Sequence, residues 1–212
     1  MKDIIYDFYG YNTDIFYAIN HACSLPLIQY ILKYISAIFD IEMFAVYYCI
    51  MLCILSYRIF TLKQYEQYSF CYDFMVKLGI CYACFGFTYA ILKFSINMPR
   101  PFCSLAYSTF TTILDISNER CQSSFPSAHT GLAFLITIFL WNYLHNISRA
   151  YLLSVVALVA IARIGLAMHY PSDILYSIPL AAAVHTLGIL IYDGFENNVI
   201  AWVKKKIWKI ML

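Results

Sequence analysis

Charged residues are scarce in this chain. Lys, Arg, Asp and Glu make up 12% of its 212 residues, whereas hydrophobic residues make up 62%. A soluble domain has about 25% charged and about 45–50% apolar residues, so this composition indicates an integral membrane protein. The formal net charge is only +2. We therefore expect no nucleic-acid partner, because such partners select strongly basic surfaces.

The pattern of a cleavable signal peptide is also missing. Asp3, Asp7 and Asp14 lie where a signal peptide would carry basic residues followed by an apolar core. We therefore expect the first membrane span itself to act as the targeting signal.

The eight cysteines do not form the pattern of a small secreted disulfide framework. Four lie in apolar segments, where we expect them to pack as small apolar side chains: Cys49, Cys53, Cys81 and Cys84. The Cys81-x-x-Cys84 spacing is also that of a metal or redox motif, but no matching second pair accompanies it. Cys103 and Cys121 share one polar segment, and whether they form a disulfide depends on the compartment that this segment faces.

Five segments have the length and hydropathy of a transmembrane helix, which needs about 20 mostly apolar residues. They are residues 41–60, 72–93, 129–146, 149–168 and 173–192. Residues 14–38 are ambiguous, because Pro26 and several polar side chains interrupt them. Two short interfacial helices suit this pattern better than one clean span, although a sixth span is also compatible with it. The expected fold class is all-α, a polytopic helical membrane protein with five or six transmembrane helices.

Lys and Arg in short loops predict the orientation of the chain in the membrane. They gather in three regions: Arg58 and Lys63 after the first span, Arg149 before the fourth, and Lys204, Lys205, Lys206 and Lys209 in the tail. With five spans, these regions share one side, which should be cytoplasmic. The other side receives residues 1–40, 94–128 and 169–172. We expect a single membrane domain over 1–212, with an interfacial or first-span segment at 1–40, core spans at 41–192 and a basic cytoplasmic tail at 193–212.

The first polar cluster follows the second span. Lys93 ends the span, and Arg100 stands between Pro99 and Pro101, which make the chain leave the helix. Taken alone, the cluster is compatible with a snorkelling lysine and an arginine that contacts lipid headgroups.

The second cluster enters the third span. Ser127 is a predicted N-cap, which places Ala128 and His129 in the first helical turn. Free backbone N–H groups at a helix start bind phosphate, and a histidine beside them can donate a proton to a leaving group. An interfacial histidine next to an ordinary cap is the alternative interpretation.

The third cluster joins the fourth and fifth spans. Arg163 precedes His169 by six residues, which is not a helical repeat, so the helix should end near His169. We expect Ser172 to cap the next helix, with Asp173 in its first turn. Asp173 can then orient the His169 imidazole and leave its other nitrogen as a nucleophile. A structural Arg163–Asp173 ion pair is the alternative.

Together the clusters offer cations, backbone donors, two histidines and one carboxylate on the same side. This combination suits phosphoryl transfer through a phosphohistidine. No cluster of carboxylates suited to magnesium is evident, and we expect neither a metal nor another cofactor.

The three clusters resemble the motifs of the type 2 phosphatidic acid phosphatase (PAP2) superfamily, membrane lipid phosphatases related to vanadium haloperoxidases. Lys-x6-Arg-Pro matches from Lys93 to Pro101, Pro-Ser-Gly-His from Pro126 to His129, and Ser-Arg-x5-His-x3-Asp from Ala162 to Asp173. The resemblance covers residues 41–192. It departs at Ala128, where the family has glycine, and at Ala162, where it has serine.

The resemblance implies a role for each matching residue. His169 would be the nucleophile, Asp173 would orient it, and His129 would be the general acid. The phosphate would be held by the side chains of Lys93, Arg100 and Arg163 and by the backbone of Ser127, Ala128 and His129.

The function we expect is hydrolysis of a phosphomonoester or pyrophosphate on a membrane lipid. Candidate substrates are undecaprenyl pyrophosphate, lipid A, phosphatidylglycerol phosphate and phosphatidic acid. A lipid phosphotransferase of the same superfamily would use the same motifs. A transporter or non-catalytic scaffold is disfavoured, because the charges converge on one face. Abundant Ile, Tyr and Asn are typical of an AT-rich bacterial genome, so we expect a bacterial inner membrane with the site on the periplasmic side.

Overall fold

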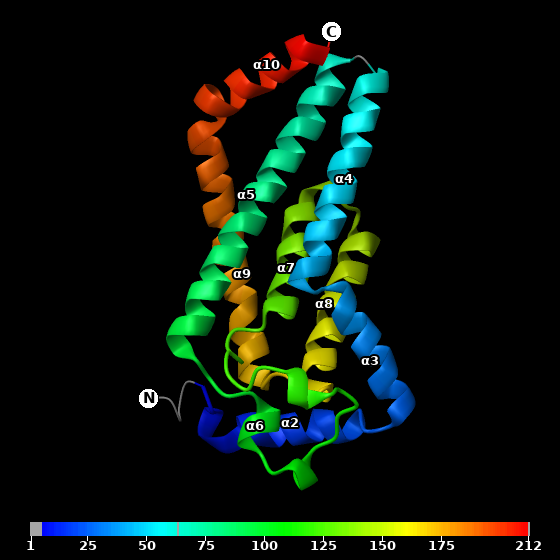
Figure 1. The fold of residues 1–212 in the computed structure, drawn as a ribbon, viewed down its shortest axis with the longest axis vertical. Coiled ribbons are helices and arrows are strands. Elements are labelled where there is room, and N and C mark those ends of the chain that lie inside the picture. Colours follow the sequence, from blue (N-terminus) through cyan, green and yellow to red (C-terminus); the bar gives the residue numbers. More distant parts are fainter. Residues whose placement is uncertain (1–5, 63, 212) are drawn as a thin grey trace.

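The structure, a computed structural model, describes residues 6–62 and 64–211, and all regular elements in these ranges are helical. The helices of the bundle are α4 (Ile41–Leu62), α5 (Tyr65–Ile96), α7 (Ala128–Leu140), α8 (Asn146–Gly165) and α9 (Pro171–Phe195) (Figure 1). α9 packs against α5 and α7, and α7 packs against α8. The all-α, polytopic membrane class expected from the sequence is confirmed.

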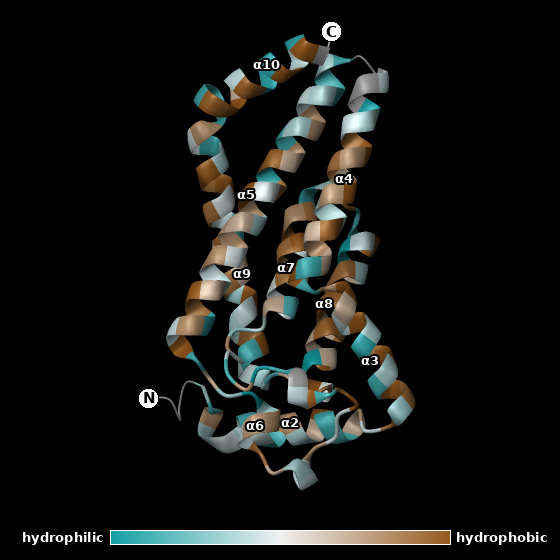
Figure 2. Cartoon of the chain, viewed as in Figure 1, coloured by the Kyte–Doolittle hydropathy of each residue, from teal (hydrophilic) through white to brown (hydrophobic). Residues whose placement is uncertain are grey.

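Shorter elements surround the bundle. They are η1 (Phe8–Gly10), α2 (Tyr11–Ala22), α3 (Pro26–Ile38), α6 (Pro101–Ser104), η2 (Tyr107–Thr109), η3 (Ile116–Asn118), η4 (Trp141–Tyr143), η5 (Glu196–Ile200) and α10 (Ala201–Met211). α2 lies across one end of the bundle, and α10 crosses the other end, beside the start of α5 (Figure 1). Hydrophobic residues follow the long helices, and hydrophilic residues are more frequent in the loops below the bundle (Figure 2).

Four stretches are long and apolar enough to cross a membrane: Ile41–Arg58, Tyr65–Ser104, Asn146–Gly165 and Pro171–Ile210. The pair of segments Phe8–Ala22 and Pro26–Ile38 makes a fifth if it counts as one span. The expected third span over 129–146 is not met in full, because α7 has 13 residues and ends in the η4 turn. At 1.5 Å per residue, α7 rises about 20 Å, which is less than the roughly 30 Å hydrocarbon core.

The ambiguous segment before residue 40 forms two helices rather than one straight span. The helical segments on either side of Ser24 are bent by 112°. Asn20 and Gln29 donate side-chain hydrogen bonds to the Gly165 carbonyl at 2.9 and 2.7 Å. These bonds satisfy a carbonyl that the end of α8 leaves without a helical partner. The N-terminal helices therefore brace the chain where α8 ends.

Close approach of α5, α7 and α9 depends on two glycines. A Cβ at Gly188 would lie 2.6 Å from Cys81 Sγ, and a Cβ at Gly131 would overlap the Tyr89 hydroxyl. Small residues at such crossings let helix backbones come near enough for extensive van der Waals contact. Cys81 is buried here as a free thiol, as expected for a packing residue.

The basic tail turns back onto the bundle at the end opposite α2. Lys204 on α10 forms an ion pair with Asp73 on α5 at 2.8 Å, and Tyr192 donates a hydrogen bond to the same carboxylate. The last turn of α4 and the start of α5 lie at this end too (Figure 1). Arg58, near the end of α4, and the lysines of α10 thus share one end of the molecule, which agrees with the orientation prediction for two of its three basic regions; Lys63 lies outside the described residues.

Candidate active site

The first cluster lies where α5 ends. Asn97 adopts a left-handed conformation (φ 48°) that stops the helix just after Lys93. The Lys93 ammonium donates to the Ser123 carbonyl at 2.8 Å. Arg100 precedes α6, and its guanidinium contacts Glu119 at 3.1 Å and the Met168 sulfur at 3.8 Å. The two cations therefore converge on the loop that leads to α7.

The second cluster places His129 in the first turn of α7, as expected. Ser127 occupies the N-cap position, but its side chain makes no capping bond; it donates to Thr130 Oγ1 at 3.2 Å instead. The Ser127 N–H donates to the Asp173 carbonyl at 3.3 Å. This corrects the expectation that the Ser127 backbone is available to phosphate. Ala128 and His129 do line the cavity described below.

The third cluster begins in the last turn of α8. Ala167 has φ 59°, and the Met168 and His169 N–H groups both donate to the Arg163 carbonyl. This left-handed ending takes the chain out of the helix before His169, as the spacing predicts. The Arg163 guanidinium donates to Ser36 Oγ at 2.7 Å. In the described part of the chain no ion pair joins Arg163 to Asp173, so the structural alternative is not supported.

The start of α9 differs from its expected cap. Tyr170 is the N-cap, Pro171 is the first helical residue, and the Asp173 carboxylate accepts from the Tyr170 N–H at 2.9 Å. The prediction that Ser172 caps this helix is wrong. Proline at this position pre-sets the helical φ, which moves the start of the helix two residues earlier. Ser172 exchanges two hydrogen bonds with the Asn12 side chain on α2 instead.

His169 and Asp173 form a buried pair. His169 Nδ1 lies 3.4 Å from Asp173 Oδ2, and the two side chains are 1% and 0% exposed. Asp173 also accepts hydrogen bonds from Tyr6 at 2.6 Å and from Ser124 at 2.5 Å. Burial, reinforced by Arg163 and the other cations, holds the pKa of His169 well below its usual range. The imidazole is therefore neutral near pH 7, the state that a nucleophile needs.

A cavity of about 640 Å³ joins the three clusters. Lys93, Arg100, Arg163, His129 and His169 all line it. The Nε atoms of Arg100 and Arg163 are buried and have no hydrogen-bond partner among residues 6–62 and 64–211. Buried donors without a partner are costly, so these groups indicate that an anion completes the site.

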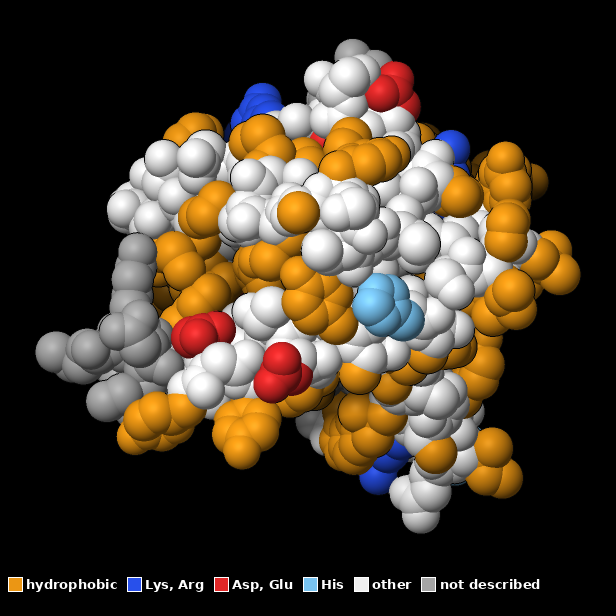
Figure 3. Space-filling view, turned by 90° about the horizontal axis from the view of Figure 1, so that it is seen from below, with side chains coloured by type: hydrophobic (Ala, Val, Ile, Leu, Met, Phe, Trp, Pro, Cys, Tyr) orange, Lys and Arg blue, Asp and Glu red, His pale blue; other side chains and the backbone are white. Residues whose placement is uncertain are grey.

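The cations of the site are turned inward. The side chain of Arg100 is 12% exposed, and Arg163 as a whole is 6% exposed. From the end that carries α2, most of the visible surface is apolar or uncharged, and the few Lys and Arg side chains lie near its rim (Figure 3). An anion held by these cations would therefore be bound within the cavity rather than on this face.

Asp40, which no motif in the sequence singles out, lies between α3 and α4. Its Oδ2 is 3.7 Å from His129 Nε2 across the cavity. The interaction with His129 lowers the pKa of Asp40 to about 2, so the carboxylate is charged at neutral pH. The only signal in the sequence is a charged residue at the start of an apolar span. That signal does not indicate that the Asp40 side chain contacts His129, which lies 89 residues later in the chain.

Cys103 and Cys121 form a disulfide, which resolves the alternative left open by the sequence. Cys81 and Cys84 are both free thiols. Within residues 6–62 and 64–211, no group of three or more His, Cys, Asp or Glu side chains has an arrangement suited to a metal ion.

Comparison with known structures identifies two similar folds. Aquifex aeolicus LpxE superimposes with a TM-score of 0.63 at 18% identity, covering 84% of this chain and 94% of that one. The first transmembrane PAP2 type phosphatidylglycerolphosphate phosphatase from Bacillus subtilis gives 0.58 at 19% identity, covering 88% and 87%. At these identities the likeness establishes the fold.

Comparison with curated protein sequences finds no match. The family model of the PAP2 superfamily matches residues 74–196, more than half of the chain. That range contains all three clusters, from Lys93 on α5 to Asp173 on α9, and the structure brings them to one cavity. This chain is therefore a member of the PAP2 superfamily.

Proposed function

We propose that the protein is a lipid phosphatase that removes a phosphoryl group from a membrane lipid through a phosphohistidine on His169. The observation that carries the proposal is the convergence of three cations and two histidines on one cavity at the end of a membrane bundle. Lys93, Arg100 and Arg163 supply the positive charge that stabilises the oxygens of a phosphoryl group in transfer.

In the first step, His169 attacks phosphorus. Asp173 faces Nδ1 and keeps its proton there, which leaves the lone pair of Nε2 for the attack. The phosphorus–oxygen bond to the lipid breaks, and His129 protonates the leaving oxygen. Burial and Arg163 lower the pKa of His129, whereas Asp40, which lies opposite it, raises this pKa and so favours the protonated imidazole that this step requires.

In the second step, water attacks the phosphohistidine. His129, now neutral, accepts a proton from this water, and the bond between nitrogen and phosphorus breaks. Inorganic phosphate leaves, and both histidines return to their starting states. A second lipid hydroxyl in place of water would give phosphotransfer.

We infer that the substrate is a bacterial envelope lipid and that the site faces the periplasmic side of the inner membrane. Arg58, near the end of α4, and the lysines of α10 lie at the opposite end of the molecule (Figure 1). They support this orientation, because basic residues mark the cytoplasmic side. Undecaprenyl pyrophosphate, lipid A, phosphatidylglycerol phosphate and phosphatidic acid are the lipids to test.

The deciding experiment measures phosphate release from these four lipids by the detergent-solubilised protein and by H169A. We expect the variant to lose at least about 10³-fold in kcat, because the nucleophile is removed. H145A is the matched control, since His145 lies before α8 and outside the cavity. Activity retained in H169A would rule out the assigned nucleophile.

A labelling experiment tests the intermediate. With a substrate labelled by ³²P in the transferred group, the wild type should acquire acid-labile label in a rapid quench, and H169A should not. Label that persists in H169A would place the covalent step, if there is one, on another residue.

A further inference from the structure

The loop between α5 and α7 is folded back on itself beside the cavity. The Arg100 N–H donates to the Cys121 carbonyl at 2.8 Å, and the Ser124 N–H donates to the Met98 carbonyl at 2.9 Å. The Cys103–Cys121 disulfide closes this pairing, with the two Cα atoms 5.5 Å apart. The segment that carries Arg100 is thereby joined covalently to the segment that leads to His129.

Contacts that hold the proposed phosphate site come from residues within three positions of Cys121. Glu119 accepts from the Arg100 guanidinium, and the Ser123 carbonyl accepts from Lys93. Ser124 donates to Asp173, which faces the nucleophile. One short segment therefore supports two of the cations and the carboxylate of the site.

Part of this segment is held in an unfavourable conformation. Ser123 has φ 74°, in the left-handed region that residues other than glycine rarely adopt. Such a conformation persists only when the surrounding structure over-determines it. The disulfide two residues earlier and the hydrogen bond from Ser124 to Met98 supply that restraint.

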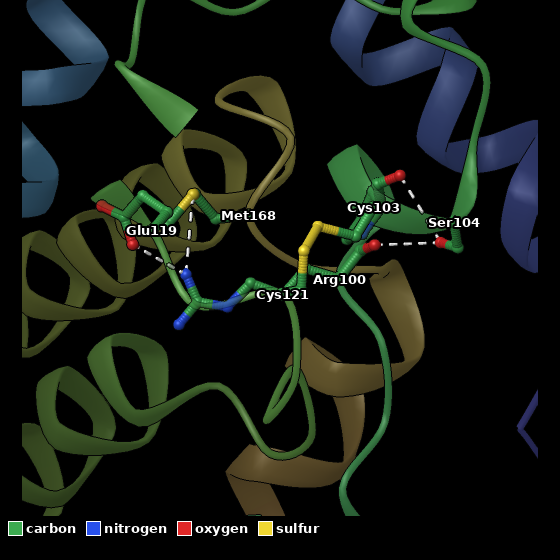
Figure 4. Close-up of a disulfide and its surroundings, with 7 residues drawn as sticks. Arg100, Cys103, Ser104, Glu119, Cys121 and Met168 are labelled. Atoms are coloured by element: carbon green, nitrogen blue, oxygen red, sulfur yellow. Dashed lines mark hydrogen bonds and ion pairs between the residues drawn. A yellow bond between two sulfur atoms is a disulfide. The ribbon is translucent and has the colours of Figure 1, made fainter. Parts of the chain in front are cut away.

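The Arg100 side chain extends away from the disulfide, toward Glu119 and Met168 (Figure 4). Its backbone is tied on both sides: its N–H bonds to Cys121, and its carbonyl accepts from Cys103 and Ser104. The disulfide thus fixes the backbone from which the guanidinium reaches the cavity. Neither of its cysteines lines the cavity.

Both members of the disulfide are accessible. Cys103 and Cys121 are both exposed. The six free cysteines of the described chain lie elsewhere, on or beside helices. An exposed disulfide can be reduced by a soluble dithiol, which becomes oxidised to its own disulfide while two protein thiols form. Reduction would break the covalent link between two cysteines that lie 18 residues apart in the sequence.

We propose that the Cys103–Cys121 disulfide is a positioning element of the phosphate site, so that anion affinity depends on the oxidised state of this pair. The proposal rests on the lipid phosphatase function proposed above. With the bond intact, Arg100 and Lys93 are held toward the cavity. With the bond reduced, the loop gains alternative conformations. Phosphate binding must then order the loop, and the lost conformational entropy makes the binding free energy less favourable.

The experiment uses the purified full-length protein in detergent. Peptide mass spectrometry without reductant first measures the fraction of Cys103 linked to Cys121. The oxidised and dithiothreitol-reduced forms are then compared for lipid KM, for kcat and for competitive inhibition by inorganic phosphate. We expect KM and the phosphate inhibition constant to rise about tenfold on reduction, the equivalent of one charged hydrogen bond, with a smaller change in kcat.

Matched variants separate the effect from general reduction damage. C103S/C121S should show the raised constants without reductant and should not respond to it, whereas C49S/C53S should respond like the wild type. Reoxidation of the reduced wild type should restore the original constants. If the double variant does not fold, the reduced wild type, with its fold checked by thermal unfolding, decides the question.

Two outcomes would overturn the inference: unchanged KM and phosphate inhibition in fully reduced protein, or free Cys103 and Cys121 thiols in fully active protein. Failure of the proposed function is distinguishable from these. In that case no lipid releases phosphate, and redox-dependent binding of inorganic phosphate, measured by calorimetry, still supports or refutes the positioning role.

Discussion

Replacing Asp173 by asparagine removes one negative charge from beside His169 at nearly constant side-chain volume. The carboxylate now accepts hydrogen bonds from Tyr6, Ser124 and the Tyr170 backbone, and its Oδ2 lies 3.4 Å from His169 Nδ1. An asparagine has one acceptor oxygen instead of two, so at least one of these donors loses its partner.

The lost charge matters most while His169 bonds the phosphoryl group, because the imidazole ring then becomes cationic. Two unit charges 3.4 Å apart attract each other by about 5 kcal/mol at an effective dielectric constant of about 20. Since about 1.36 kcal/mol corresponds to a tenfold change in rate, D173N should lower kcat between about 10³- and 10⁴-fold.

The assay is single-turnover phosphate release by detergent-solubilised protein, with thermal unfolding measured on the same preparations. S124A is the matched control: it removes one hydrogen bond to Asp173 but keeps the charge, and should cost about tenfold. A folded D173N that keeps more than about a tenth of the wild-type kcat would refute the electrostatic role of Asp173.

Three further predictions concern other parts of the molecule. D40N should move the alkaline limb of the kcat/KM profile to lower pH by about one unit, because the carboxylate that favours protonated His129 is lost. Since the pKa of Asp40 is about 2, its charge is present throughout the neutral range and disappears only as pH falls toward 2; an unshifted profile would contradict the pairing. G188A should lower the free energy of unfolding by about 1–3 kcal/mol, because its Cβ would lie 2.6 Å from Cys81 Sγ. G194A, where a Cβ has nothing within 4 Å, should not be destabilised, and equal losses in the two variants would argue against a close α5–α9 contact. C103S/C121S should lose about 3 kcal/mol of unfolding free energy in denaturant titrations, as expected for opening a loop of this length; unchanged stability would mean that the loop is held by its other contacts.

The ends of the helices show where prediction from local sequence succeeds and where it fails. Pro99 and Pro101 correctly predicted that the chain leaves the helix after Lys93, and the spacing from Arg163 to His169 correctly required α8 to end. The cap of α9 was misplaced, because Pro171 competes with Ser172 for the start of the helix and Asn12 binds Ser172 from another element.

The partners of the motif residues show the same division. Local spacing placed His169 four residues before Asp173, and that contact is present. It gave no indication that Ser36 binds Arg163 or that Glu119 binds Arg100. These contacts join residues far apart in the chain, and nothing in hydropathy or helical periodicity depends on them.

By itself, the sequence determined the membrane class, the helical content and the three clusters that carry the chemistry. These properties follow from composition, apolar length and short spacings, all of which are local. Only the tertiary structure decided that the clusters share one cavity, that Asp40 faces His129, and that Cys103 and Cys121 are joined. The physical reason is that each of these features depends on how α2 to α9 pack. The free energy of packing comes from contacts among many residues that are distant in the chain, so no single segment determines it.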